Sequence, residues 1–323
     1  MAGMLERSPG PGRLRELLGG DGLVVAPGAY DALSARMVEA AGFPCVYMTG
    51  FGTAASLLGR PDIGLLTGTE MIDNARRITG AVALPVVADA DTGYGNAFNV
   101  IRTVSDYERA GVAGIHLEDQ ALPKRCGHMS GKVLVPKGEM VAKVRAAVEA
   151  RTDPDLVLIA RTDARAVEGL ASALDRAASY LEAGADVLFV EAPEDEAEVE
   201  QVAQAFRGVP LLFNWAAGGR TPPVSLERLH ELGFRLVIFP IGLLLAATAA
   251  MRSFLDTLAK EGTPASMLGG LPSFAGFVDF LGMTEVRRLE ERFGSVGTSI
   301  PRRFPRRDVP PDTPAKGRLP GPS

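Results

Sequence analysis

Short β-branched runs alternate with longer Ala-, Glu- and Arg-rich segments along most of the chain, and this alternation restricts the fold more than any other sequence feature. The runs predict about eight strands, spaced by roughly 20 to 45 residues. They are Leu23–Ala26, Cys45–Met48, Pro85–Ala88, Ala113–Leu117, Val157–Ala160, Val187–Val190, Pro210–Phe213 and Leu236–Phe239. A repeated order of strand, loop and helix indicates a parallel α/β sheet, and eight units predict a closed (β/α)8 TIM barrel.

Helical periodicity fills the intervals between these runs. Helices are predicted at Asp31–Ala41, Ser105–Ala110, Lys137–Ala150 and Leu170–Ala183. Several of them end in an Ala-Gly pair before the next strand, as at Ala41-Gly42, where glycine suits a left-handed cap. A doubly wound open sheet is the alternative, but no Gly-x-Gly-x-x-Gly motif follows the first predicted strand.

The two ends of the chain differ from the middle. We expect a loose N-terminus over residues 1–12 and a barrel domain over 13–300. Further helical signals between Leu271 and Phe293 exceed what eight units need. Residues 301–323 are rich in Pro, Arg and Gly without periodicity, and we expect them to be disordered.

Composition narrows the functional class. The net charge of −5 argues against nucleic-acid binding, which needs basic surface. The N-terminus lacks a signal-peptide pattern, and the longest apolar run, Leu236–Ala250, is interrupted by Pro240 and Gly242. Two cysteines in so long a chain fit a reducing compartment. We therefore expect a soluble cytoplasmic protein with no nucleic-acid or membrane partner.

Polar residues follow most of the predicted strands. In a barrel the carboxyl ends of the strands form the active site, so these residues should converge on one rim. They are Thr49, Gly50, Asp89, Asp91, Glu118, Asp119, Arg161, Asp163, Glu191 and Asn214. Oxygen-rich, histidine-poor surroundings suit Mg²⁺, with Mn²⁺ as the alternative ion, and the three histidines match no zinc spacing. Read singly, the aspartates could instead be turn caps, and the glutamates structural partners of Arg161.

The segment Lys124-Arg125-Cys126-Gly127-His128 places a thiol among basic groups. Such neighbours predict a lowered thiol pKa, and the glycine allows a mobile loop. An ordinary surface cysteine is the alternative. A Cys126–His128 nucleophilic pair is a further reading, although no third orienting group is evident.

Six segments of the chain resemble the isocitrate lyase/phosphoenolpyruvate mutase superfamily, and the resemblance extends from Leu14 to about Phe293. The segments are Pro27–Ala35, Leu58–Gly64, Asp89–Gly95, His116–Gln120, Lys124–His128 and Ala160–Ala164. The Lys-Arg-Cys-Gly-His loop is specific to the carbon–carbon lyase branch and its near relatives. The most similar members act on 2-methylisocitrate, 2,3-dimethylmalate or carboxyvinyl-carboxyphosphonate.

The resemblance implies a role for each matching residue. Asp89, Asp91 and Glu118 match the Mg²⁺-site acids, with Asp91 as the direct ligand and Asp62 as a supporting acid near the metal. The implied substrate-binding residues are Tyr47, Thr49, Gly50, Phe51, Gly127, His128, Arg161, Glu191 and Asn214. Cys126 matches the catalytic acid on a gating loop, and Tyr47 is the candidate that deprotonates the substrate hydroxyl. Family members are usually tetramers whose last helix swaps between subunits, which implies a homotetramer here.

The implied reaction is Mg²⁺-dependent cleavage of a 2-hydroxy di- or tricarboxylic acid. Loss of the hydroxyl proton breaks the adjacent carbon–carbon bond, giving a 2-oxo acid and an enolate that Arg161 stabilises and Cys126 protonates. Phe51, Trp215 and Gly242 depart from the methylisocitrate lyase pattern and favour a smaller or more apolar acid. The alternatives are phosphorus–carbon bond formation of the carboxyvinyl-carboxyphosphonate phosphonomutase type, oxaloacetate decarboxylation or hydrolysis, and a non-catalytic scaffold.

Overall fold

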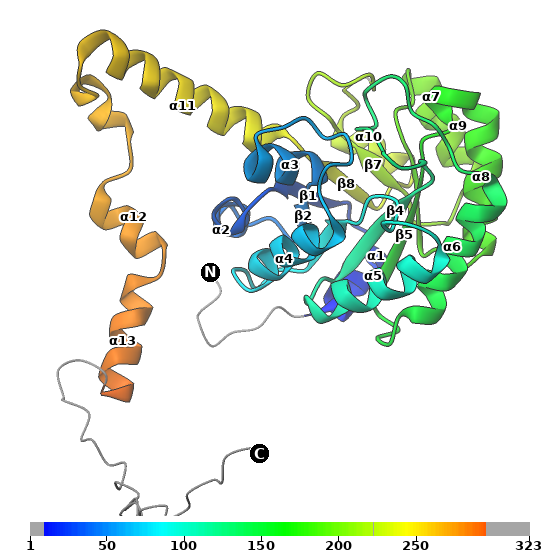
Figure 1. Cartoon of the computed structure of the whole chain (residues 1–323), viewed down its shortest axis with the longest axis horizontal. Helices are drawn as coiled ribbons and strands as arrows, with labels where there is room; N and C mark the ends of the chain where they lie inside the picture. The colour runs from blue at the N-terminus through cyan, green and yellow to red at the C-terminus, as the bar shows by residue number, and fades with distance from the viewer. Residues whose placement is uncertain (1–9, 222, 295–323) are drawn as a thin grey trace, which may run out of the picture. The chain divides into compact units, whose positions relative to one another are not determined.

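The computed structural model describes residues 10–221 and 223–294, and within them eight parallel strands form a barrel (Figure 1). The strands are β1 (Val24–Ala29), β2 (Val46–Met48), β3 (Val86–Asp89), β4 (Gly114–Glu118), β5 (Val157–Thr162), β6 (Val187–Val190), β7 (Leu212–Asn214) and β8 (Leu236–Phe239). Their order is β6-β5-β4-β3-β2-β1-β8-β7, and a parallel bridge between Leu188 and Leu211 joins the two ends. The prediction of a TIM barrel is therefore confirmed, and the open doubly wound sheet is excluded.

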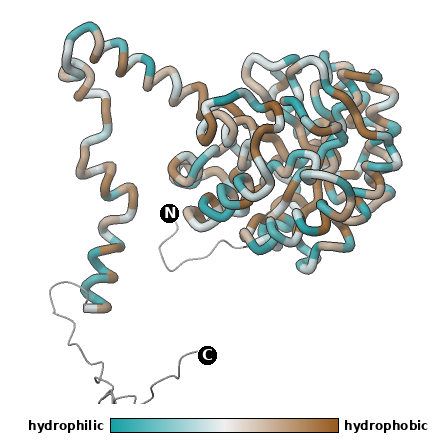
Figure 2. The backbone as a smooth tube through the Cα atoms, viewed as in Figure 1, coloured by the Kyte–Doolittle hydropathy of each residue, from teal (hydrophilic) through white to brown (hydrophobic). Residues whose placement is uncertain are grey.

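Each predicted strand coincides with an observed one to within a few residues, because the β-branched runs are buried on both faces. One hydrophobic cluster fills the barrel interior, and a second lies between the strands and the outer helices. Figure 2 shows hydrophobic residues on the central strands and hydrophilic stretches on the helices around them. Gly42, Gly111 and Gly184 have φ of 81°, 84° and 105°, which confirms the predicted left-handed caps.

Eleven α-helices and one 3₁₀ helix accompany the strands in the described part of the barrel unit. They are α1 (Pro11–Gly19), α2 (Ala32–Ala40), α3 (Gly50–Leu58), α4 (Gly68–Thr79), α5 (Ala97–Arg109), α6 (Lys137–Ala150), α7 (Arg165–Glu168), α8 (Leu170–Glu182), α9 (Glu196–Ala205), α10 (Leu226–Glu231), α11 (Gly242–Glu261) and η1 (Ala265–Gly270). Helix α1 packs Leu14 and Leu18 against the hydrophobic cluster of the barrel interior.

Two differences from the predicted helices have local causes. The helix predicted from Ser105 instead begins at Ala97, because the Asn96 side chain accepts hydrogen bonds from the backbone N–H groups of Phe98 and Asn99. The segments that form α3 and α4 lie where no helix was predicted. Thr49 and Thr67 cap their first turns in the same way.

The chain divides into two compact units, one ending at Leu271 and the other beginning at Pro272. The second unit contains α12 (Phe274–Phe280) and α13 (Met283–Phe293), at the predicted helical signals. The predicted disordered tail, 301–323, and most of the predicted loose N-terminus lie outside the described residues.

Helix α11 has no buried residue, and Leu245, Met251 and Leu255 are exposed along it. Among the described helices it alone has the length and apolar composition to cross a membrane. The predicted interruption of the run Leu236–Ala250 at Pro240 and Gly242 is confirmed, because β8 ends at Phe239 and α11 begins at Gly242. The apolar composition instead extends past Ala250 along α11. A single such helix is weak evidence for a membrane span, because an apolar helix that packs in an oligomer has the same composition.

Candidate active site

The strand ends bring four acidic side chains close to one another. Asp89 ends β3, Glu118 ends β4, Asp91 lies in the loop after β3, and Asp62 lies between α3 and α4. All four are buried, with exposed fractions of 7% or less. Burial of so many carboxyl groups is unfavourable unless positive charge or hydrogen-bond donors accompany them.

Asp89 is held by backbone groups on both sides. Its Oδ1 accepts from the backbone N–H of Asp91 at 2.9 Å, and its Oδ2 accepts from that of Gly50 at 3.2 Å. A Cβ atom on Gly50 would lie 2.3 Å from Asp89 Oδ2, so only glycine allows this approach. Gly50 thus acts through its backbone, at the start of α3.

Lys124 supplies positive charge within the acid group. Its Nζ lies 2.7 Å from Asp62 Oδ1 and 2.6 Å from Asp91 Oδ1. Burial nevertheless raises the pKa of Asp91 to about 7, and it raises the pKa of Glu118 well above its usual value. For both carboxyl groups, desolvation therefore outweighs the positive charge that Lys124 supplies.

A divalent cation fits these acids. Glu118 Oε1 is buried without a hydrogen-bond partner, and the donors are carboxylate oxygens, which Mg²⁺ prefers. Among the described residues, no three Asp, Glu, His or Cys side chains are grouped closely enough to hold an ion by themselves. The set therefore suits an ion with one direct carboxylate ligand and several waters.

Arg161 lies at the end of β5 in a buried ion cluster. Its guanidinium donates to both oxygens of Asp163, at 3.0 and 3.1 Å, and lies 3.4 Å from Glu118 Oε2. Although burial opposes the charge, these carboxylates raise the pKa of Arg161 well above its usual value. Arg161 is thus a fixed cation at the rim.

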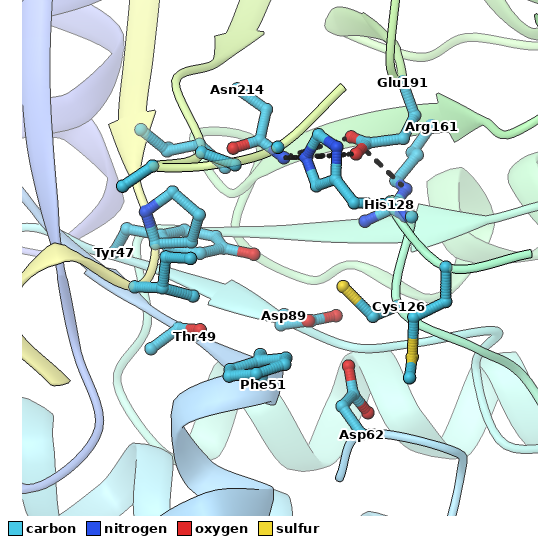
Figure 3. A pocket seen from close by; sticks show the side chains of 18 of the residues that line it. Tyr47, Thr49, Phe51, Asp62, Asp89, Cys126, His128, Arg161, Glu191 and Asn214 are labelled. Carbon is cyan, nitrogen blue, oxygen red and sulfur yellow. Dashed lines mark hydrogen bonds and ion pairs between the residues drawn. The ribbon is translucent and has the colours of Figure 1, made fainter. Parts of the chain in front are cut away.

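Cys126 is partly buried and points into the cavity (Figure 3). Its backbone N–H donates to the Asp62 carbonyl at 3.2 Å, which brings the loop over the acids. Burial raises the pKa of the Cys126 thiol to about 11. The predicted lowering of this pKa was wrong, because desolvation outweighs the nearby cations.

Both ring nitrogens of His128 are engaged. Nδ1 accepts from the backbone N–H of Arg220 at 3.2 Å, so a neutral ring carries its proton on Nε2, which lies 3.2 Å from Glu191 Oε1. Asn214 Nδ2 donates to the same carboxylate at 3.2 Å. Burial lowers the pKa of His128 and favours the neutral ring. Neither nitrogen remains to activate the Cys126 thiol, which excludes the nucleophilic pair in this arrangement.

Tyr47 and His116 form a hydrogen-bonded pair beside Asp89. The Tyr47 hydroxyl lies 2.7 Å from His116 Nε2, which in turn is 3.3 Å from Asp89 Oδ1. Burial lowers the pKa of His116 to about 4 and raises that of Tyr47 well above its usual value. Both groups are therefore neutral at pH 7.

A cavity of about 200 Å³ connects most of the predicted residues. Those that line it are Tyr47, Thr49, Phe51, Asp62, Asp89, Cys126, Gly127, His128, Arg161, Glu191 and Asn214. Gly50, Asp91 and Glu118 lie outside its lining. From the sequence, Lys124 was expected only as a basic neighbour of the thiol, and His116 had no expected role, although both stand in the matching motifs. No sequence signal indicated Lys132, which donates to the Gly127 carbonyl, or Gly219, which lies against His128.

The family model for phosphoenolpyruvate phosphomutase matches residues 14–259. The 2,3-dimethylmalate lyase of Eubacterium barkeri is 46% identical, over 88% of this chain and 98% of that protein. Carboxyvinyl-carboxyphosphonate phosphorylmutase of Arabidopsis thaliana is 42% identical (89% and 86%), and so is 2-methylisocitrate lyase of Aeropyrum pernix (83% and 86%).

Several solved structures of related enzymes are also similar to this chain. A crystal structure of 2,3-dimethylmalate lyase has a TM-score of 0.83 and 41% identity, over 88% of this chain and 97% of that one. Oxaloacetate acetylhydrolase with 3,3-difluorooxalacetate has a TM-score of 0.84 and 38% identity (90% and 99%). Phosphonopyruvate hydrolase in complex with oxalate and Mg²⁺ has a TM-score of 0.80 and 31% identity (87% and 98%).

Proposed function

The chain belongs to the isocitrate lyase/phosphoenolpyruvate mutase superfamily and is a lyase of it, and from this premise we propose that it cleaves an alkyl-substituted malate in a Mg²⁺-dependent reaction. The observation that carries the proposal is the Cys126 thiol. It is protonated at neutral pH and lines the same cavity as Asp89 and Arg161. A proton donor, a carboxylate and a fixed cation are what carbon–carbon cleavage through an enolate requires.

Asp89, Asp91 and Glu118 would hold the ion, with Asp62 supporting them. When bound there, a divalent cation would lower the pKa of the substrate hydroxyl. Lys124 Nζ contacts two of these acids, so it would share them with a bound ion and offset part of their negative charge.

We propose that Tyr47 removes the proton from the substrate hydroxyl. Because burial raises its pKa, the phenol does not ionise by itself. Tyr47 can instead accept the substrate proton while it passes its own to His116 Nε2, at 2.7 Å.

Bond cleavage then leaves charge on the departing acid. The C2–C3 bond breaks as C2 becomes a 2-oxo carbon, and its electron pair moves to C3 as an enolate. Arg161 stabilises this charge, and Cys126 Sγ donates the proton that completes the departing acid. Docking of the loop over the site excludes water from the enolate.

Several apolar residues line the cavity, and they favour an alkyl substituent. The apolar residues are Phe51, Ala216, Ala217, Ile238, Pro240 and Ile241. The lysine and arginine that line the cavity, Lys124 and Arg161, are already paired with carboxylates, and His128 is neutral. A third substrate carboxylate would therefore be buried without a charge partner, which costs about 3 to 5 kcal/mol.

Two substrates test this directly, because they differ only at C3. 2,3-Dimethylmalate carries a methyl group there and yields pyruvate and propionate, whereas 2-methylisocitrate carries a carboxymethyl group and yields pyruvate and succinate. We expect the Mg²⁺-loaded enzyme to favour dimethylmalate by about 150-fold or more in kcat/KM, which is what a penalty of about 3 kcal/mol or more implies. Preference for methylisocitrate would contradict the assignment of substrate class.

The role of Cys126 has its own test. Cys126→Ser should release no pyruvate while it still binds Mg²⁺, and Cys45→Ser, at a buried cysteine outside the cavity, is the matched control. Near-normal cleavage by Cys126→Ser would refute the acid role.

Oxaloacetate hydrolysis is the second candidate, favoured by the similarity to oxaloacetate acetylhydrolase. It predicts consumption of oxaloacetate with release of oxalate and acetate, without turnover of either malate derivative.

We further propose that the enzyme is a cytoplasmic homotetramer in which the exposed apolar side of α11 packs against another subunit. Leu245, Met251 and Leu255, exposed in the single chain, support this.

A further inference from the structure

Lys132 carries a buried ammonium ion at the far end of the loop that contains Cys126. The Lys132 side chain is 2% exposed and that of its partner Asp163 is fully buried. Lys132 Nζ donates to Asp163 Oδ1 at 2.9 Å and also to the backbone carbonyl of Gly127. One cation thus joins the residue next to Cys126 to the end of β5.

Asp163 is a rigid anchor for this contact. Its backbone N–H donates to Asp119 Oδ1 at 2.9 Å, and Asp119 also accepts from Thr162 and Tyr180 at 2.7 and 2.8 Å. Asp163 Oδ1 accepts from both Lys132 and Arg161. The lysine and the arginine are therefore positioned by the same carboxylate.

On the side away from Lys132, Gly127 packs closely against Arg161 and Glu191. A Cβ atom there would lie 2.5 Å from Arg161 Nη2 and 2.3 Å from Glu191 Oε1. The Gly127 peptide is consequently held between the Lys132 ammonium ion and the Arg161–Glu191 pair. Its position determines where the preceding Cys126 thiol lies relative to Arg161.

We propose that Lys132 is a positioning residue that holds the Cys126 loop in its docked arrangement. Without the ammonium ion, the buried Gly127 carbonyl loses a donor and Asp163 loses one of its two cations. A buried acceptor without a partner is unfavourable. The loop should therefore move out of its docked position and expose Cys126 to water.

Lys132→Met tests this in the full chain, with Arg151→Met as the control. Arg151 makes a 2.6 Å ion pair with Asp186 ahead of β6, at the opposite end of the barrel, so the control removes a charged contact without touching the loop. The first readout is the rate at which iodoacetamide alkylates Cys126 in the substrate-free enzyme, located by mass spectrometry. We expect an increase of about tenfold for Lys132→Met and a change within about twofold for Arg151→Met.

The second readout is turnover of 2,3-dimethylmalate, and this part rests on the proposed function. Because the thiol acts after the substrate has bound, kcat should fall about 100-fold while KM changes by less than about threefold. Lys132→Gln retains a donor for Gly127 but no charge for Asp163, and it should be intermediate in both readouts. If Lys132→Met does not fold, Lys132→Gln provides the test instead.

The outcomes separate the two claims. Faster alkylation without turnover by any variant or by the wild type would support the loop assignment and refute the proposed function. Unchanged alkylation in folded Lys132→Met and Lys132→Gln would overturn the positioning role, whatever the turnover.

Discussion

Gly127→Ala is the most direct perturbation of the docked loop. The added Cβ would lie 2.3 Å from Glu191 Oε1, whereas ordinary contacts begin at 3.4 Å, so the peptide must move by about 1 Å. Arg161 and Glu191 are buried and held by hydrogen bonds and ion pairs, so the loop moves while the ion cluster stays in place. Gly127 has no left-handed φ, and backbone strain therefore does not contribute.

A displacement of about 1 Å at a reacting group costs roughly 100-fold in rate. We therefore expect kcat/KM for 2,3-dimethylmalate to fall about 100-fold in Gly127→Ala, with a melting temperature within a few degrees of the wild type. Gly138→Ala is the matched control, because a Cβ at this position in α6 meets nothing within 4 Å. Activity of Gly127→Ala within about threefold of the control would refute the claim that the loop must dock closely.

Three further predictions concern other parts of the molecule. Gly219→Ala brings a Cβ to 2.8 Å from His128 Cε1 and should lower kcat/KM about tenfold, whereas Gly138→Ala, with nothing within 4 Å, should not; equal effects would contradict the role of the loop after β7. Asp119→Ala removes the acceptor of three buried donors and of Arg176, and urea unfolding should show a loss of about 3 to 5 kcal/mol; a loss under about 1 kcal/mol would show that this network is not stabilising. Leu255→Asp, at a residue 60% exposed in the single chain, should convert the expected tetramer to smaller species by light scattering, and an unchanged mass would exclude α11 from the interface.

Most of the barrel could be predicted because its signals are local. A buried strand shows a β-branched run, and a helix that ends before it shows a glycine with positive φ, as at Gly42 and Gly111. Helix α3 could not be found in this way, because its start depends on the Thr49 side chain accepting from Gly52 N–H. The candidate site followed from the fold, because residues after parallel strands share one rim.

The sequence by itself determined which groups reach the rim: the acids after β3 and β4, Arg161 after β5, and the cysteine loop. Only the tertiary structure decided whether each of these groups carries a charge and which partner it contacts. The thiol has basic neighbours along the chain, yet its pKa is raised to about 11, because folding removes water from around it. Lys132 and Asp163 are 31 residues apart, and Lys124 and Asp62 are 62 apart. Those pairs form only when the barrel closes, since periodicity describes neighbours within one element and carries no information about partners across the sheet.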